Sequence, residues 1–156
     1  MVSRTLRRTP LTALHIVLGL ALVTVNLAAG ALGALRWSRG EPSPAFWPLL
    51  RAGQLLVVGE VVLGGVLVAV GEELPRLHLL YGLLPLGVSF IGEQLRAVAA
   101  QTVLQARGLE GREAIEALPE AERRELVLEI LRRELGVMAA TALVVAVLGV
   151  RAGGVI

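Results

Sequence analysis

Residues 11–35 have the sequence LTALHIVLGLALVTVNLAAGALGAL, an apolar run without Asp, Glu, Lys or Arg. A helix needs about 20 mostly apolar residues to cross the hydrocarbon core of a bilayer, so this run is long enough for one span. Three further apolar runs follow, at residues 46–70, 77–100 and 135–150. Successive spans run in opposite directions, and the pattern therefore predicts an all-α integral membrane protein, an antiparallel four-helix bundle in a single domain over residues 1–156.

A polar connector at residues 101–134 separates spans three and four. Pro119 and Glu120 are typical of a helix N-terminus, because proline fits the first turn and an acid favours the positive end of the helix dipole. Leu126 and Ile130 then form an apolar stripe among Glu and Arg. We expect an amphipathic helix here, either on the membrane surface or as a solvated linker, and it can continue into span four.

The composition narrows the classes of function. The chain is 55% hydrophobic with a mean hydropathy of +0.73, which suits a membrane protein surrounded by lipid. It has no cysteine, which excludes disulfides, iron–sulfur clusters and thiol chemistry. A net charge of +2 and 3% aromatic residues give no footprint for nucleic acid. All acids are Glu and all cations other than His are Arg, a bias typical of GC-rich coding, and we expect a prokaryotic plasma membrane.

Both histidines of the chain occur in the same short motif. Residues 14–20 read LHIVLGL and residues 77–83 read LHLLYGL, so the pattern Leu-His-x-x-x-Gly-Leu occurs in spans one and three. These two spans run parallel, because one span separates them. His15 and His78 are therefore expected within one or two helical turns of the same membrane face, which we call side A; the opposite face is side B.

Small and polar residues continue along the same helix faces. His15 shares its face with Gly19 and Asn26, and His78 shares its face with Gly82. Such faces turn towards other helices rather than lipid, and histidine inside a span usually faces protein or a cavity. Two imidazoles from different helices are good axial ligands for haem iron, and a glycine one turn away clears space for the macrocycle. We expect His15 and His78 to ligate the iron of haem b, beside Gly19 and Gly82.

Two other interpretations of the histidines stay open. A histidine near the end of a span is often an interfacial residue that hydrogen-bonds a neighbouring group. Zinc is a further alternative, although two histidines without cysteine or aspartate leave its set of four ligands incomplete.

A resemblance to a known family supports the haem interpretation. The sequence GQLLVVGEVVLGGV at residues 53–66, followed by LHLL at residues 77–80, resembles one four-helix half of a haem A synthase. In that family a glycine-punctuated helix precedes a short loop and a helix that carries a haem-ligating histidine. More loosely, the His15 span is similar to the histidine-bearing helices of four-helix membrane cytochromes of the b type. The resemblance implies haem binding, with His15 and His78 as ligands.

Glu60 lies near the middle of span two, where a carboxyl group is costly and often functional. It can relay protons, or hydrogen-bond a haem propionate, a quinone or Asn26. The alternative is a neutral carboxyl group that hydrogen-bonds across helices and only holds the bundle together.

A second polar group is expected towards side B. Antiparallel pairing of spans two and three places Glu93 within reach of Gln54, Arg51 or Arg96. This cluster can bind an anionic or quinone-like headgroup, or it can simply connect the helices. Tyr81, one turn from His78, can orient a ligand or act as an ordinary interfacial tyrosine.

These residues predict a haem-b-binding membrane cytochrome, or a subunit of one, that transfers electrons near the membrane surface with partner membrane subunits or quinone. The alternatives are a cofactor-free scaffold subunit of a membrane complex and a small quinone-binding or transporter-like protein. The sequence contains no nucleophile–base pair, phosphate loop or zinc motif, so it does not indicate an enzymatic reaction.

Overall fold

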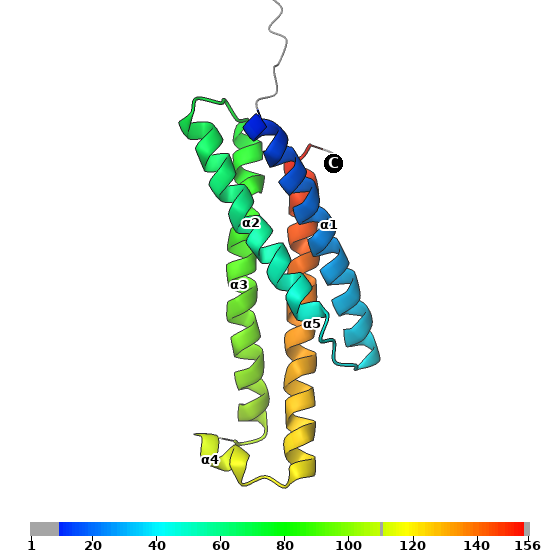
Figure 1. Ribbon diagram of the computed structural model, residues 1–156. Helices are drawn as coiled ribbons and strands as arrows, with labels where there is room; N and C mark the ends of the chain where they lie inside the picture. Colours follow the sequence, from blue (N-terminus) through cyan, green and yellow to red (C-terminus); the bar gives the residue numbers. More distant parts are fainter. Residues whose placement is uncertain (1–9, 110, 155–156) are drawn as a thin grey trace, which may run out of the picture.

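The computed structural model of the protein describes residues 10–109 and 111–154. Within these residues the chain forms five helices and no strand (Figure 1), which are α1 (Pro10–Arg39), α2 (Phe46–Ala69), α3 (Arg76–Ala106), α4 (Gly111–Glu116) and α5 (Glu120–Ala152). Helices α1, α2, α3 and α5 are long and apolar enough to cross a membrane. The predicted all-α four-helix bundle of an integral membrane protein is therefore confirmed.

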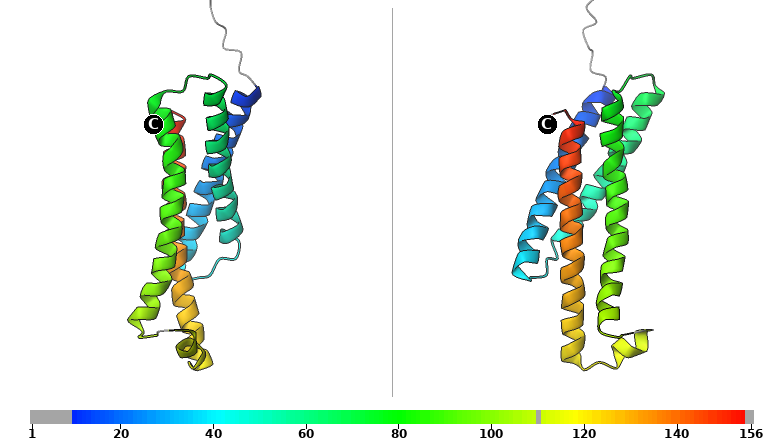
Figure 2. Two further views of the ribbon diagram at one scale, coloured as in Figure 1. Left: turned by 90° about the vertical axis from the view of Figure 1, so that its left-hand side faces the viewer. Right: turned by 180° about the vertical axis from the view of Figure 1, so that it is seen from behind.

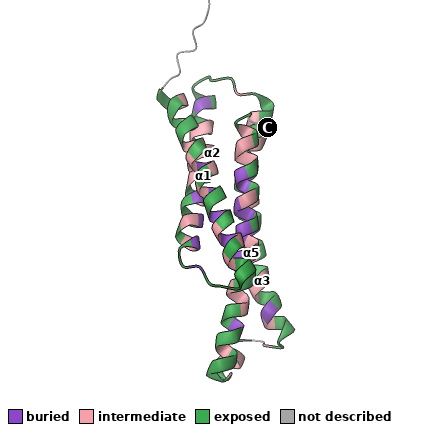
Figure 3. Cartoon of the chain, turned by 90° about the vertical axis from the view of Figure 1, so that its right-hand side faces the viewer, coloured by how far each residue is buried: buried purple, intermediate pink, exposed green. Residues whose placement is uncertain are grey.

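The outer surface of the bundle is apolar. Leu20, Leu55 and Phe90 are 65%, 73% and 66% exposed, on three different helices. A soluble protein would bury such side chains, whereas a membrane protein presents them to lipid. Figure 3 shows that the buried residues gather where the four long helices meet. Helix α5 packs extensively against both α1 and α3, and α1 packs against α2.

Two of the long helices extend beyond the other two. Helix α5 has 33 residues and is thus about 50 Å long, well above the roughly 30 Å of a hydrocarbon core. Figures 1 and 2 show that α3 and α5 lie side by side and continue past the α1–α2 loop to α4, forming a projecting hairpin. The opposite end of the bundle holds the start of α1, the end of α5 and the α2–α3 loop, and is side A.

The predicted amphipathic connector forms most of this projecting hairpin. It is continuous with span four in a single helix, because no proline or loop-forming sequence interrupts α5 after Pro119. Its apolar stripe is covered by protein: Leu126 is 1% exposed, and Val103 on the adjoining part of α3 is 0% exposed. An ion pair of 2.7 Å between Arg107 and Glu129 also joins the two sides. The stripe therefore packs within the hairpin instead of lying on a membrane surface.

Helices α1 and α2 pack in one antiparallel register. A Cβ built on Gly33 of α1 would lie 2.6 Å from a ring carbon of Phe46, so the ring occupies the space of the missing side chain. One heptad further along both helices, a Cβ on Gly53 of α2 would lie 2.8 Å from the amide oxygen of Asn26. Each glycine thus receives a larger side chain from the other helix, and the repeated seven-residue step fixes the register.

This packing predicts a site-specific loss of stability. We expect Gly33→Ala to lower the free energy of unfolding by about 1–3 kcal/mol, because the added methyl group would overlap Phe46 and also lie 2.7 Å from the Cβ of Ala139. The matched control is Gly59→Ala, where a Cβ meets nothing within 4 Å, so the free energy of unfolding should stay unchanged or rise by up to about 1 kcal/mol through the better helix propensity of alanine. Unfolding in mixed micelles with increasing SDS, followed by circular dichroism, measures both values. Equal losses at the two positions would contradict the assigned register.

Candidate functional site

The two histidines meet inside the bundle near side A. His15 comes from α1 and His78 from α3, and their Nε2 atoms lie 3.4 Å apart. The ring centroids are 5.7 Å apart and the ring planes form an angle of 71°. The structure thus brings together the two residues that share the repeated motif, and points the same nitrogen of each ring at the other.

The remaining nitrogen of His78 has a partner on the backbone. Its Nδ1 lies 2.9 Å from the carbonyl oxygen of Ala152, in the last turn of α5. A carbonyl oxygen can only accept a hydrogen bond, so Nδ1 carries the proton and donates it. In a neutral imidazole the Nε2 atom of His78 then has a free lone pair that faces His15.

The remaining nitrogen of His15 has an acidic neighbour. Its Nδ1 lies 2.7 Å from Oε2 of Glu60 on α2, and the two side chains are only 17% and 12% exposed. Two lone pairs would repel at this distance, so a proton must lie between the two atoms. The contact lacks the angle of a good hydrogen bond, and Oε1 of Glu60 has no hydrogen-bond partner among the described residues.

Glu60 reaches His15 through the α1–α2 register. A Cβ built on Gly19 would lie 3.7 Å from Oε2 of Glu60, and this pair follows Asn26 and Gly53 by one heptad. Of the partners expected for Glu60, Asn26 lies elsewhere: it packs on Gly53, seven residues and thus about 10 Å from Glu60 along α2, and its amide nitrogen donates to the carbonyl oxygen of Leu22 at 2.9 Å. The heptad spacing of Phe46, Gly53 and Glu60 was the signal in the sequence that could have identified this arrangement.

A cavity of about 730 Å³ surrounds the two imidazoles. All four long helices contribute to its walls, which are mainly aliphatic and glycine-rich. The lining includes Gly19 from α1, Glu60 and Gly64 from α2, Tyr81, Gly82 and Pro85 from α3, and Gly149 from α5. A Cβ on Gly82 would meet nothing within 4 Å, so this glycine borders open space. Both glycines expected beside the histidines, Gly19 and Gly82, line the cavity.

The second predicted cluster forms at the other end of the spans. Oε1 of Glu93 accepts hydrogen bonds from Arg51 at 2.6 Å and from Gln54 at 2.8 Å, and Oε2 accepts one from Arg96 at 3.0 Å. Arg96 also reaches Glu134 on α5 at 3.6 Å. Glu93 thus contacts all three residues that the sequence placed within its reach, and the cluster joins α2, α3 and α5.

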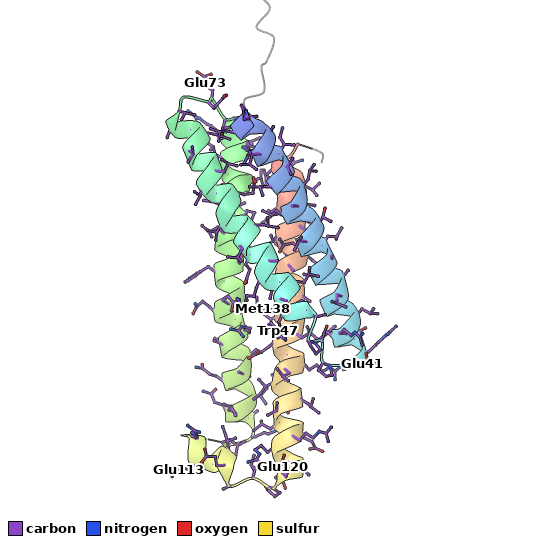
Figure 4. All side chains as sticks on the ribbon, in the orientation of Figure 1. Glu41, Trp47, Glu73, Glu113, Glu120 and Met138 are labelled. Carbon is purple, nitrogen blue, oxygen red and sulfur yellow. The ribbon has the colours of Figure 1, made fainter. Side chains whose placement is uncertain are left out.

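The two polar groups are separate sites. Along α3, Glu93 lies about 22 Å beyond His78, most of the thickness of a hydrocarbon core. Both carboxylate oxygens of Glu93 already have partners, which suits a connection between helices. Figure 4 places Met138 at the level of Trp47, away from side A. Met138 is 0% exposed in the core and is therefore not a ligand for the histidine site.

Sequence reasoning missed one member of the histidine site, the carbonyl group of Ala152. No side-chain signal marks a backbone acceptor, and the contact depends on where α5 ends.

Comparisons with protein-family models, with curated proteins and with solved structures gave no match to this chain, so only the site itself indicates its function.

Proposed function

We propose that the protein is a haem-b-binding membrane cytochrome, or a subunit of one, of a prokaryotic plasma membrane. It would take part in electron transfer near side A. The observation that carries the proposal is the opposed pair of Nε2 atoms, 3.4 Å apart, with each Nδ1 atom next to an oxygen on its far side. A histidine that ligates a metal usually has such an oxygen behind it, because this partner fixes the ring and its tautomer.

The spacing of the two rings fits two bonds to one metal ion. With protons on both Nδ1 atoms, the facing Nε2 atoms of His15 and His78 would each carry a lone pair and repel. An ion between them removes this repulsion. Metal–imidazole bonds of about 2.0 Å would separate the nitrogen atoms by about 4 Å, so each ring would have to move back by only about 0.3 Å.

The surroundings favour a large apolar cofactor over a bare metal ion. The cavity of about 730 Å³ lies within the roughly 300–1,000 Å³ of typical cofactor sites. Both Gly19 and Gly82 line this cavity, and a Cβ on Gly82 would meet nothing within 4 Å, which leaves space beside His78. A structural zinc site needs four protein ligands, and the described residues contain no cluster of three or more His, Cys, Asp or Glu that could hold a metal ion.

Each residue has a definable task in this proposal. His15 and His78 would hold the iron, Glu60 and the Ala152 carbonyl would orient the two rings, and the aliphatic walls would exclude water. A bound haem supplies one-electron redox chemistry. The resemblance to a haem A synthase half supports haem binding. The chain lacks the glutamate close before a His-Arg pair that this family has, so haem A synthesis is not part of the proposal.

The visible spectrum tests the proposal directly. The protein is expressed with ample haem, purified in detergent and recorded in the oxidised and reduced forms. We expect a strong Soret band and, on reduction, the split visible bands of a six-coordinate, low-spin haem with two imidazole ligands. Protein that stays colourless after reconstitution with haem would refute the proposal.

A second candidate function follows from a different placement of the protons. A protonated Glu60 can donate to Nδ1 of His15, which then donates from Nε2 to His78, and His78 donates to Ala152. This chain of contacts favours a proton relay in a small quinone-binding or transporter-like protein. In colourless protein, nitrogen NMR would then find the proton of His15 on Nε2. A proton on Nδ1 would leave the cofactor-free scaffold as the remaining alternative.

A further inference from the structure

A second, smaller pocket lies between the α1–α2 loop and α5. Loop residues 40–44 form one wall, and leucine side chains of α5 contribute to the other. Its volume of about 170 Å³ is well below the roughly 300 Å³ at which cofactor sites begin, and it equals the liquid volume of about six water molecules. Figure 4 shows Glu41 and Trp47 at this end of α1 and α2, away from side A. The pocket is therefore separate from the histidine cavity and suits a small chemical group.

The pocket lies at the level of the lipid headgroups on side B. Arg132 lines it and precedes Ala152, at the side A end of α5, by about 30 Å of helix, which is the thickness of a hydrocarbon core. Trp47 also lines the pocket, and Trp37 lies in the last turn of α1, before the loop. Tryptophan is enriched where a membrane meets water. A polar group in this pocket would therefore lie where lipid phosphates lie.

Arg132 is the unbalanced charge of the pocket. It is exposed and forms no ion pair with a described residue. Its guanidinium carbon lies 4.0 Å from the position of a Cβ on Gly40, so the guanidinium group adjoins the loop. Glu41 is the one acid among the described residues that line the pocket, and it is paired with Arg36 at 2.5 Å. These three charged groups together carry a net charge of +1, which favours an anionic occupant.

Ser43 adds a hydroxyl group from the loop. The residue is only 7% exposed although it lines the pocket, and its hydroxyl group forms no hydrogen bond with a described residue. Hydroxyl groups of buried residues are usually hydrogen-bonded, so this one is available to an occupant. Pro42 and Pro44 restrict the backbone on either side of Ser43, so little entropy is lost when a ligand binds there.

We infer that this pocket binds the phosphate group of an anionic phospholipid from the side B leaflet. The planar guanidinium group of Arg132 can donate two parallel hydrogen bonds to phosphate oxygens, and the Ser43 hydroxyl can donate a third. The depth of the pocket and its leucine wall favour a lipid over a free phosphate ion, because a lipid also presents apolar chains to the helices. A bound lipid would connect the α1–α2 loop to α5. This inference does not depend on a cofactor in the histidine cavity.

Native mass spectrometry of the detergent-purified protein tests this inference, because it separates the first bound lipid from weaker, later ones. The protein is titrated with phosphatidylglycerol, with phosphatidylcholine, which has a phosphate group but no net charge, and with inorganic phosphate. We expect the first phosphatidylglycerol to bind most tightly. R132Q should weaken its binding about tenfold and S43A about threefold, as for lost hydrogen bonds to a charged group.

The matched control is R39Q. Arg39 ends α1 beside the loop, is exposed, forms no ion pair with a described residue and does not line the pocket. R39Q should therefore bind phosphatidylglycerol as wild type does. Equal losses in R39Q and R132Q would indicate a general effect of surface charge and overturn the inference, as would wild-type affinity in both R132Q and S43A. Equal affinity of the wild type for the two lipids, or displacement of phosphatidylglycerol by inorganic phosphate, would also overturn it.

Discussion

Replacement of His15 or His78 by alanine is expected to abolish the six-coordinate, low-spin spectrum. Each variant would leave the iron with one imidazole, and the double variant with none. Loss of a residue that only orients a ligand already costs about 10–100-fold in metal affinity, so loss of the ligand itself should exceed about 100-fold. Haem titration with detection at the Soret band measures the effect.

The described residues contain no third histidine and no cysteine that could take over the lost position. Methionine, which can also ligate haem iron, occurs in the described residues only at Met138, which is packed in the core with Phe46 and Leu50. Circular dichroism should show that the helices remain, because both imidazoles border a cavity and removing them leaves the core intact. A double-alanine protein that still binds haem with a low-spin spectrum would show that the ligands lie elsewhere.

The second large effect is expected from filling the cavity at Gly82. A tryptophan there should exclude haem, because its ring would occupy the space beside His78. A Cβ at Gly82 meets nothing within 4 Å, so the backbone tolerates a side chain and the loss would be steric. We expect at least a tenfold drop in bound haem, since the tryptophan ring and the macrocycle cannot occupy the same space.

Gly87 provides the matched control on the same helix. A Cβ at Gly87 also meets nothing within 4 Å, but this residue does not line the cavity. Gly87→Trp should therefore bind haem as wild type does. If the two variants retained the same amount of haem after purification in the same detergent, the cofactor would have to bind outside this cavity.

The fold was predictable because hydropathy and span length dominate in a membrane protein. Four apolar runs separated by polar or turn-rich links leave few alternatives to a helical bundle. The helix ends were less predictable. The pattern at residues 101–134 allowed a surface helix or a linker. Only the burial of Val103 and Leu126 and the ion pair between Arg107 and Glu129 show that the start of α5 pairs with the end of α3.

The histidine site was predictable as far as helix periodicity reaches. The repeated motif placed His15 and His78 at one depth and on inward faces, and the structure brings their rings together. The partner of Glu60 was not identified, because it depends on the packing register of α1 against α2. The Ala152 carbonyl could not be identified either, since every residue has one and only the tertiary structure selects it.

The depth of the imidazole pair has an electrical consequence. His15 lies about 7.5 Å along α1 from Pro10, which is about a quarter of a hydrocarbon core of roughly 30 Å when the helix end marks its edge. Moving one elementary charge across the whole membrane costs about 2.3 kcal/mol per 100 mV. A charge that reaches the imidazoles from side A would therefore do only about 0.6 kcal/mol of work per 100 mV, against about 1.7 kcal/mol from side B. The membrane voltage would therefore oppose or drive charge exchange through side A only about a third as strongly as exchange through side B.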